Sequence, residues 1–206
     1  STKAFTSQLS VLALFVLNLQ QECSTINKTF FNSIFDIHNY VEEILKKENE
    51  FKKIAKTLVN TKSIFYIGRG VMYPIALEGA LKLKEITYKH CEGYAAGELK
   101  HGPLALIENN IPVIVLAPFD ENYSKLLSNI QEVKARGGRI IMITDRDGAK
   151  KVKKYCDQIV IIPKTNFLTS PILYSIPVQL IAYYLAVFLG TDVDQPRNLA
   201  KSVTVE

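Results

Sequence analysis

Apolar residues in the first fifty positions recur every three or four residues. This spacing places them along one side of a helix, so we expect helices from the start of the chain to about residue 50. The clearest series are Phe5, Leu9, Leu12, Val16 and Leu19, and then Phe30, Ile34, Ile37, Val41 and Ile44. Because no strand-like run occurs before residue 60, the first quarter of the chain is predicted to be helical.

The pattern changes after residue 60, where short runs of β-branched and aliphatic residues alternate with helical patterns. The predicted strands are residues 63–67, 112–117, 139–144 and 158–162, with a further short strand at 92–95. The predicted helices are residues 73–89, 122–136, 150–155 and 171–189. Such alternation is typical of a parallel sheet with helices on both faces. We therefore predict an α/β fold preceded by a helical segment.

Two apolar stretches raise the question of a membrane span. Residues 11–17 are apolar without interruption, and residues 172–189 are mostly apolar over nearly the length of a transmembrane helix. Ser175, Pro177 and Gln179 interrupt the second stretch. We expect both stretches to be buried helices in the core of a folded domain, with no membrane partner.

The composition is that of an ordinary packed domain. Of the 206 residues, 48% are hydrophobic and 22% are charged, which excludes a disordered or fibrous chain. Lys and Arg exceed Asp and Glu by 25 to 20, giving a net charge of +5. The densest basic cluster, residues 150–154, is interpreted as a solvated helix face, so no nucleic-acid partner is expected.

Isolated Cys and His residues carry little functional signal. Cys23, Cys91 and Cys156 have no metal-ligand spacing and form an odd count, so we expect reduced thiols and no metal site. Cys91 and Cys156 are expected to be inert. His38 and His90 lie outside any segment that resembles a site, and we expect them to be structural or exposed.

A glycine-rich turn follows the first predicted strand. Residues 68–70 read Gly-Arg-Gly directly before a helix, a position at which parallel sheets often bind ligands. A dinucleotide fingerprint would need a further glycine where the sequence has Tyr73. A nucleotide cofactor is therefore disfavoured, and the turn either contacts a ligand or only reverses the chain tightly.

Candidate chemistry lies in the helix and loop that come next. Glu78, Lys82 and Glu85 are spaced i, i+4 and i+7 and so share one helix face. Alone, they could form an exposed ladder of ion pairs. However, residues 93–103 are rich in glycine and alanine and contain His101, and a carboxylate near an imidazole suits proton transfer at neutral pH. Together these segments favour an active site.

Three blocks in this order point to one family. They are residues 78–85 (EGALKLKE), 96–103 (AGELKHGP) and 194–206 (DQPRNLAKSVTVE), and residues 1–6 (STKAFT) fit the same pattern. With these blocks, which run from one end of the chain to the other, the sequence resembles the isomerase half of the glutamine–fructose-6-phosphate aminotransferase family.

The resemblance implies a sugar isomerase (SIS) architecture, a flavodoxin-like parallel sheet of five strands that occurs twice in the isomerase half. Residues 1–50 would then be a helical remnant of the first SIS domain with its linker, 51–190 the second SIS domain, and 191–206 a C-terminal tail. The glutaminase domain and most of the first SIS domain, with its phosphate-binding loop, would be missing. We therefore expect this chain alone to have little or no activity.

The resemblance also implies an activity, in which fructose 6-phosphate and ammonia from glutamine become glucosamine 6-phosphate in hexosamine biosynthesis. Lys201 would form a Schiff base with the sugar, although a free lysine with a pKa of about 10.4 is protonated at pH 7 and needs help to become neutral. Glu85 would move a proton between C1 and C2, and Lys82 would stabilise charge on oxygen. His101 would open the sugar ring from the neighbouring subunit.

The same resemblance also predicts substrate contacts, partners and a location. Ser1, Ala200 and Glu78 would help to bind the substrate, without a cofactor or a metal. The expected partners are a sugar phosphate, a second copy of the chain in a homodimer, and the glutaminase and first SIS domains of a full-length protein. The expected location is the cytoplasm.

Two alternatives stay open. One is a non-catalytic SIS module that binds a phosphosugar as a regulator, although the joint presence of Glu85, His101 and Lys201 disfavours it. The other is a dimerisation or scaffold fragment in which the site residues are present but unused.

Overall fold

The computed structural model describes residues 2–23 and 28–197. Its strands are β1 (Ser63–Gly68), β2 (His90–Ala95), β3 (Pro112–Ala117), β4 (Arg139–Thr144) and β5 (Gln158–Ile161). Its α-helices are α1 (Thr2–Cys23), α2 (Lys28–Phe35), α3 (Ile37–Leu45), α4 (Glu48–Leu58), α5 (Met72–Thr87), α6 (Tyr123–Ala135), α7 (Arg146–Val152) and α8 (Ser170–Leu189). The short 3-10 helices η1 (Ala96–His101) and η2 (Pro103–Leu106) follow β2.

The strands form a parallel sheet in the order β2-β1-β3-β4-β5. In the register, Tyr66 of β1 lies between Gly93 of β2 and Ile114 of β3. Every residue of β3 is buried, as expected for a central strand with helices on both sides. The predicted α/β fold is confirmed, and β3 and β4 have the bounds that the sequence predicts.

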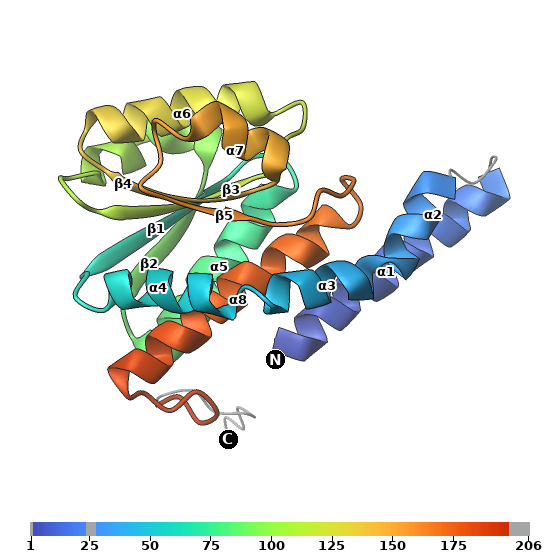
Figure 1. Ribbon diagram of the computed structural model, residues 1–206, viewed down its shortest axis with the longest axis horizontal. Helices are drawn as coiled ribbons and strands as arrows, with labels where there is room; N and C mark the ends of the chain where they lie inside the picture. Colours follow the sequence, from blue (N-terminus) through green and yellow to red (C-terminus); the bar gives the residue numbers. More distant parts are fainter. Residues whose placement is uncertain (1, 24–27, 198–206) are drawn as a thin grey trace, which may run out of the picture.

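Each strand contributes to two hydrophobic cores, because successive side chains point to opposite faces of the sheet. Ile64 and Tyr66 pack with residues of α4, α5 and α8, whereas Phe65 and Ile67 pack with residues of α6 and α7. Figure 1 shows the corresponding layers, with α6 and α7 on one side of the sheet and α4, α5 and α8 on the other.

Helices α1 to α3 form an arm that leads away from the sheet (Figure 1). Both α1 and α3 contact α8. Ala13 and Leu17 of α1 are buried, but Val11 and Phe15 are 62% and 57% exposed. The prediction that residues 11–17 form a buried core helix is therefore wrong, because α1 packs only one stripe of its apolar surface within the described part of the chain.

The second apolar stretch behaves as predicted. In α8, Leu173, Val178, Ile181 and Leu185 are all buried, so this helix belongs to the core. By length and composition, α1 and α8 are the helices of the described residues that could cross a membrane, and α8 is mostly buried in the fold while most of α1 is exposed.

Helix α7 begins four residues before the predicted helix at 150–155. The buried carboxylate of Asp145 accepts hydrogen bonds from the backbone N–H groups of Asp147 and Gly148, at 2.9 and 3.0 Å. These bonds satisfy N–H groups that have no partner inside the helix and so fix its start. The helix ends at Val152, so the end of the lysine cluster lies in the following turn.

Candidate active site

Helix α5 carries a compact group of charged side chains. Lys82 Nζ donates a hydrogen bond of 2.6 Å to Glu85 Oε2 and lies 3.9 Å from Glu78 Oε1. The side chains of Glu78, Lys82 and Glu85 are 10%, 13% and 27% exposed. The structure therefore argues against an exposed ladder of ion pairs, because all three side chains are largely buried.

Glu78 is the member of this group whose charged form is least stabilised by its surroundings. Burial raises its pKa, the nearby Lys82 ammonium lowers it, and the Glu85 carboxylate raises it again, with a net increase above the usual value of 4.5. Its Oε1 atom is buried and accepts no hydrogen bond from the described residues. Buried carboxylate oxygens without such a bond are uncommon and call for an explanation.

The Lys82–Glu85 pair opens onto a cavity of about 1360 Å³. The walls come from the start of α1, from α3, α5 and α8, and from residues 193–196 after α8. Its lining residues are Thr2, Val41, Leu45, Lys82, Glu85, Ile86, Ile176, Gln179, Leu180, Ala182, Tyr183, Val193, Asp194, Gln195 and Pro196. An ion pair at a partly apolar cavity suits the binding of a small polar ligand.

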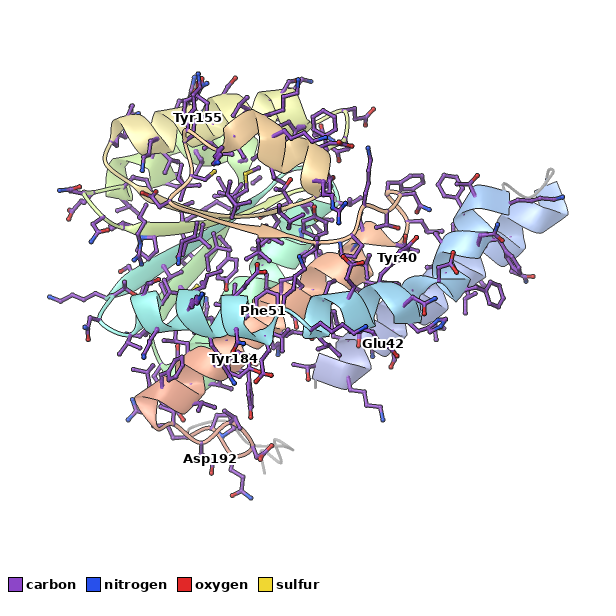
Figure 2. All side chains as sticks on the ribbon, in the orientation of Figure 1. Tyr40, Glu42, Phe51, Tyr155, Tyr184 and Asp192 are labelled. Atoms are coloured by element: carbon purple, nitrogen blue, oxygen red, sulfur yellow. The ribbon has the colours of Figure 1, made fainter. Side chains whose placement is uncertain are left out.

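The segment after α8 is attached to the end of α5. Thr191 Oγ1 donates a hydrogen bond of 2.6 Å to the carbonyl oxygen of Ile86. The backbone N–H of Arg197 donates to the hydroxyl oxygen of Tyr88 at 2.8 Å, and the Arg197 guanidinium lies 4.2 Å from the centre of the same ring. These contacts hold the segment against the cavity, which residues 193–196 line. In Figure 2, Asp192 marks this segment below the end of α8.

Tyr88 is also the point at which α5 ends. Its φ angle of 58° is left-handed and closes the helix, so α5 stops at Thr87 rather than at the predicted residue 89. This conformation is unusual for a residue other than glycine or asparagine at a helix end.

The sequence-predicted residues outside α5 fall into two groups. Ser1, Ala200 and Lys201 lie outside the described residues. His101 ends η1, which directly follows β2, and its side chain is 76% exposed, with Nε2 4.0 Å from Glu98 Oε2.

Glu85 and His101 lie toward opposite ends of the parallel strands. Since β1 and β2 are parallel, the α5 crossover between them runs in the reverse direction. Glu85 near its end is thus toward the amino ends of the strands, whereas His101 follows the carboxyl end of β2. Within a single copy of the described chain, the carboxylate and the imidazole therefore lie at opposite ends of the strands.

The Gly-Arg-Gly turn after β1 has a clear packing role. A Cβ atom on Gly68 would lie only 2.2 Å from the carbonyl oxygen of Met72, so only glycine lets the first turn of α5 approach the strand this closely. This contact supports the tight-reversal interpretation of residues 68–70.

Two histidines and two cysteines named from the sequence have ordinary surroundings. His38 Nδ1 lies 2.7 Å from the carbonyl oxygen of Phe35, and His90 is exposed. Burial raises the pKa of Cys156 to about 12 and raises that of Cys91 further, which leaves both as neutral thiols. Within residues 2–23 and 28–197, no group of three or more His, Cys, Asp or Glu is placed to hold a metal ion.

Sequence reasoning missed part of the cavity wall. Gln179 and Tyr183 of α8 line it together with Val41 and Leu45 of α3. The available signal was weak: Gln179 interrupts an otherwise apolar helix, and it stands one helical turn before Tyr183.

Comparison with known proteins now adds to this geometry. The model of the SIS domain family matches residues 57–189, which include the sheet and α5 to α8. The chain belongs to the SIS domain family.

Curated relatives of this SIS chain share half of its residues. Glutamine–fructose-6-phosphate aminotransferase [isomerizing] from Bartonella henselae is 52% identical over the whole chain, and so is the enzyme of the same name from Mesorhizobium japonicum. The chain spans about a third of the length of these relatives, 35% in both cases.

Solved structures agree in fold. The C-terminal domain of glucosamine-fructose-6-phosphate aminotransferase from Francisella tularensis has a TM-score of 0.88 and 41% identity, covering 95% of this chain and 56% of that one. Tagatose-6-phosphate ketose/aldose isomerase from Escherichia coli has a TM-score of 0.65 at 22% identity, covering 82% of this chain and 47% of its own. The second match shows the fold alone.

Proposed function

We propose that this SIS chain is the sugar-isomerising part of a glutamine–fructose-6-phosphate aminotransferase. The observation that carries the proposal is the largely buried Lys82–Glu85 ion pair at the cavity. The chain is also about half identical, over its whole length, to enzymes of that name. The substrate would be fructose 6-phosphate with ammonia from glutamine, and the product glucosamine 6-phosphate. No cofactor is needed for this proposal.

Glu85 is the proposed proton carrier. Aldose–ketose conversion requires a base that takes a proton from one of two neighbouring carbons and returns it to the other. The carboxylate of Glu85 faces the cavity and is held by Lys82 at 2.6 Å. Lys82 then has two roles, because its ammonium positions Glu85 and can stabilise negative charge on the adjacent sugar oxygen.

Lys201 is the proposed Schiff-base residue. Residues 193–196 of the tail line the cavity. Thr191 bonds the end of α5 and Arg197 bonds Tyr88, and Arg197 stands four positions before Lys201 in the sequence. Ser1 and Ala200 are proposed to contact the sugar, and Thr2, the neighbour of Ser1, lines the cavity. Glu78 is proposed to bind the substrate through its Oε1, which accepts no hydrogen bond from the described residues.

His101 is proposed to open the sugar ring in a homodimer. Its exposed side chain lies toward the opposite ends of the parallel strands from Glu85. This separation supports the proposal that His101 comes from a second copy of the chain. The glutaminase and first SIS domains of a longer protein are the other proposed partners, and the cytoplasm is the proposed location. The division at residues 50 and 190 is part of this proposal.

A chimera tests the function. The segment of the Bartonella henselae enzyme that matches this chain would be replaced by the chain itself, and glucosamine 6-phosphate formation measured. We expect an active chimera, no detectable product from the chain alone, and a loss of about 10²- to 10⁴-fold for Glu85→Gln. Glu121→Gln, at an exposed acid of the loop before α6, is the matched control.

Other outcomes of the chimera experiment would point to different conclusions. A folded but inactive chimera would contradict the proposed function. If that chimera still bound fructose 6-phosphate, the alternative of a non-catalytic phosphosugar-binding module would be favoured. Product formation by the chain alone would show that it needs no other domain.

A further inference from the structure

Gln179 of α8 stands out among the residues of the cavity. It lines the cavity with Lys82 and Glu85, yet its Nε2 atom is buried and donates no hydrogen bond to any described residue. A buried amide donor without a partner is unfavourable, and native proteins rarely keep one without a reason.

The packing of α5 against α8 brings this amide close to the charged pair. A Cβ atom added to Gly79 would lie 3.0 Å from the Val178 Cβ, so the two helices approach each other closely at this point. Gln179 directly follows Val178, and Lys82 lies one turn beyond Gly79. Gln179 and Lys82 thus lie near this close approach of the two helices, and both line the cavity.

The chemistry of the amide indicates the kind of group that it would bind. A carboxamide offers both a donor and an acceptor, and a hydroxyl group can use both. The Gln179 nitrogen is buried and bonded to no described residue, and turning the amide by 180° about its last side-chain bond would exchange the positions of its nitrogen and oxygen. Tyr183, one turn later on the same helix, adds an aromatic surface to the same wall.

We propose that Gln179 binds a hydroxyl group of the sugar phosphate held beside Lys82 and Glu85. This inference rests on the proposed function. Gln179 would contribute affinity and orientation for the sugar and would transfer no proton, because an amide does not titrate.

The test uses the active chimera with Gln179→Met, which keeps the length of the side chain and removes its hydrogen bonds. We expect the KM for fructose 6-phosphate to rise about five- to tenfold, the equivalent of one neutral hydrogen bond. The KM for glutamine should stay unchanged, which gives an internal control. Gln131→Leu, at an exposed glutamine of α6 on the other side of the sheet, is the control variant.

Other results would overturn the inference in distinguishable ways. An unchanged KM for fructose 6-phosphate in Gln179→Met would reject the binding role and leave the proposed function standing. A lower melting temperature with no change in KM would assign the amide a structural role instead. An inactive, folded chimera with the native Gln179 would reject the proposed function and this inference together.

Discussion

The ionisation of Glu78 has a cost in the folded chain. Burial is the largest effect on this carboxyl group and, despite Lys82, its pKa lies above 4.5. The folded chain therefore holds this proton more tightly than the unfolded chain does. The resulting stability is fully present below about pH 4.5 and is lost as the pH rises through the folded-state pKa.

Replacing Glu78 by Gln should therefore stabilise the chain at neutral pH. We expect Glu78→Gln to raise the melting temperature by about 1–2 °C at pH 7, with the difference shrinking as the pH falls toward 4. The measurement is thermal unfolding of both proteins from pH 4 to 7, with Glu121→Gln as an exposed control. A variant less stable than the native chain at pH 7 would show that Lys82 outweighs burial at this site.

At the scale of elements, the sequence predicts the sheet better than the helices around it. Residues 112–117 and 140–143 are continuous apolar runs, and short runs of this kind bounded by turn signals are consistent with a buried strand. The start of α7 depends on the Asp145 cap, a single residue that the lysine-rich pattern after it obscured. The exposure of α1 could not be predicted from the sequence, because an apolar run does not show which other surface packs against it.

The candidate site was predictable only where it depends on one helix. The spacing of Glu78, Lys82 and Glu85 is enough to place them on a common face of α5. Gln179 belongs to no local pattern, because its importance comes from the packing of α8 against α5. The separation of Glu85 from His101 follows from the direction of the crossover, which periodicity alone does not address.

Helices α1 and α8 offer a direct comparison of two apolar helices in different surroundings. Most of α8 is buried in the core, whereas α1 buries only a narrow stripe. Since local stability follows the number of buried contacts, backbone amides of α1 should exchange with deuterated solvent about 100-fold faster than those of α8. Peptide-level hydrogen–deuterium exchange measures this, with β3 as the protected reference. Equal protection of α1 and α8 would mean that another surface covers α1 in solution.

At the scale of the whole molecule, the cavity draws its walls from the arm, the core helices and the tail together. His101 lies at the opposite ends of the strands from Glu85, so one copy carries the two proposed catalytic groups at separate places. A symmetric pair of chains can join the two groups twice, once at each site.

Mixing two inactive variants tests this arrangement. Chimeras with Glu85→Gln or His101→Ala should each be inactive as homodimers. In a mixed dimer, one site combines an intact Glu85 with an intact His101, so co-expression should restore about a quarter of the native activity if the subunits pair at random. The measurement is product formation by the co-purified pair. Activity no higher than that of the separate variants would place both groups in one subunit.

Tyr88 shows how stability and catalysis can select for different residues. A glycine at this position would adopt the left-handed turn at the end of α5 without strain. It would also remove the ring and the hydroxyl that hold Arg197 and, with it, the segment leading to Lys201. A mutation that improves the thermal resistance of this protein could therefore release the tail on which the proposed reaction depends, and a screen for stability alone would select it.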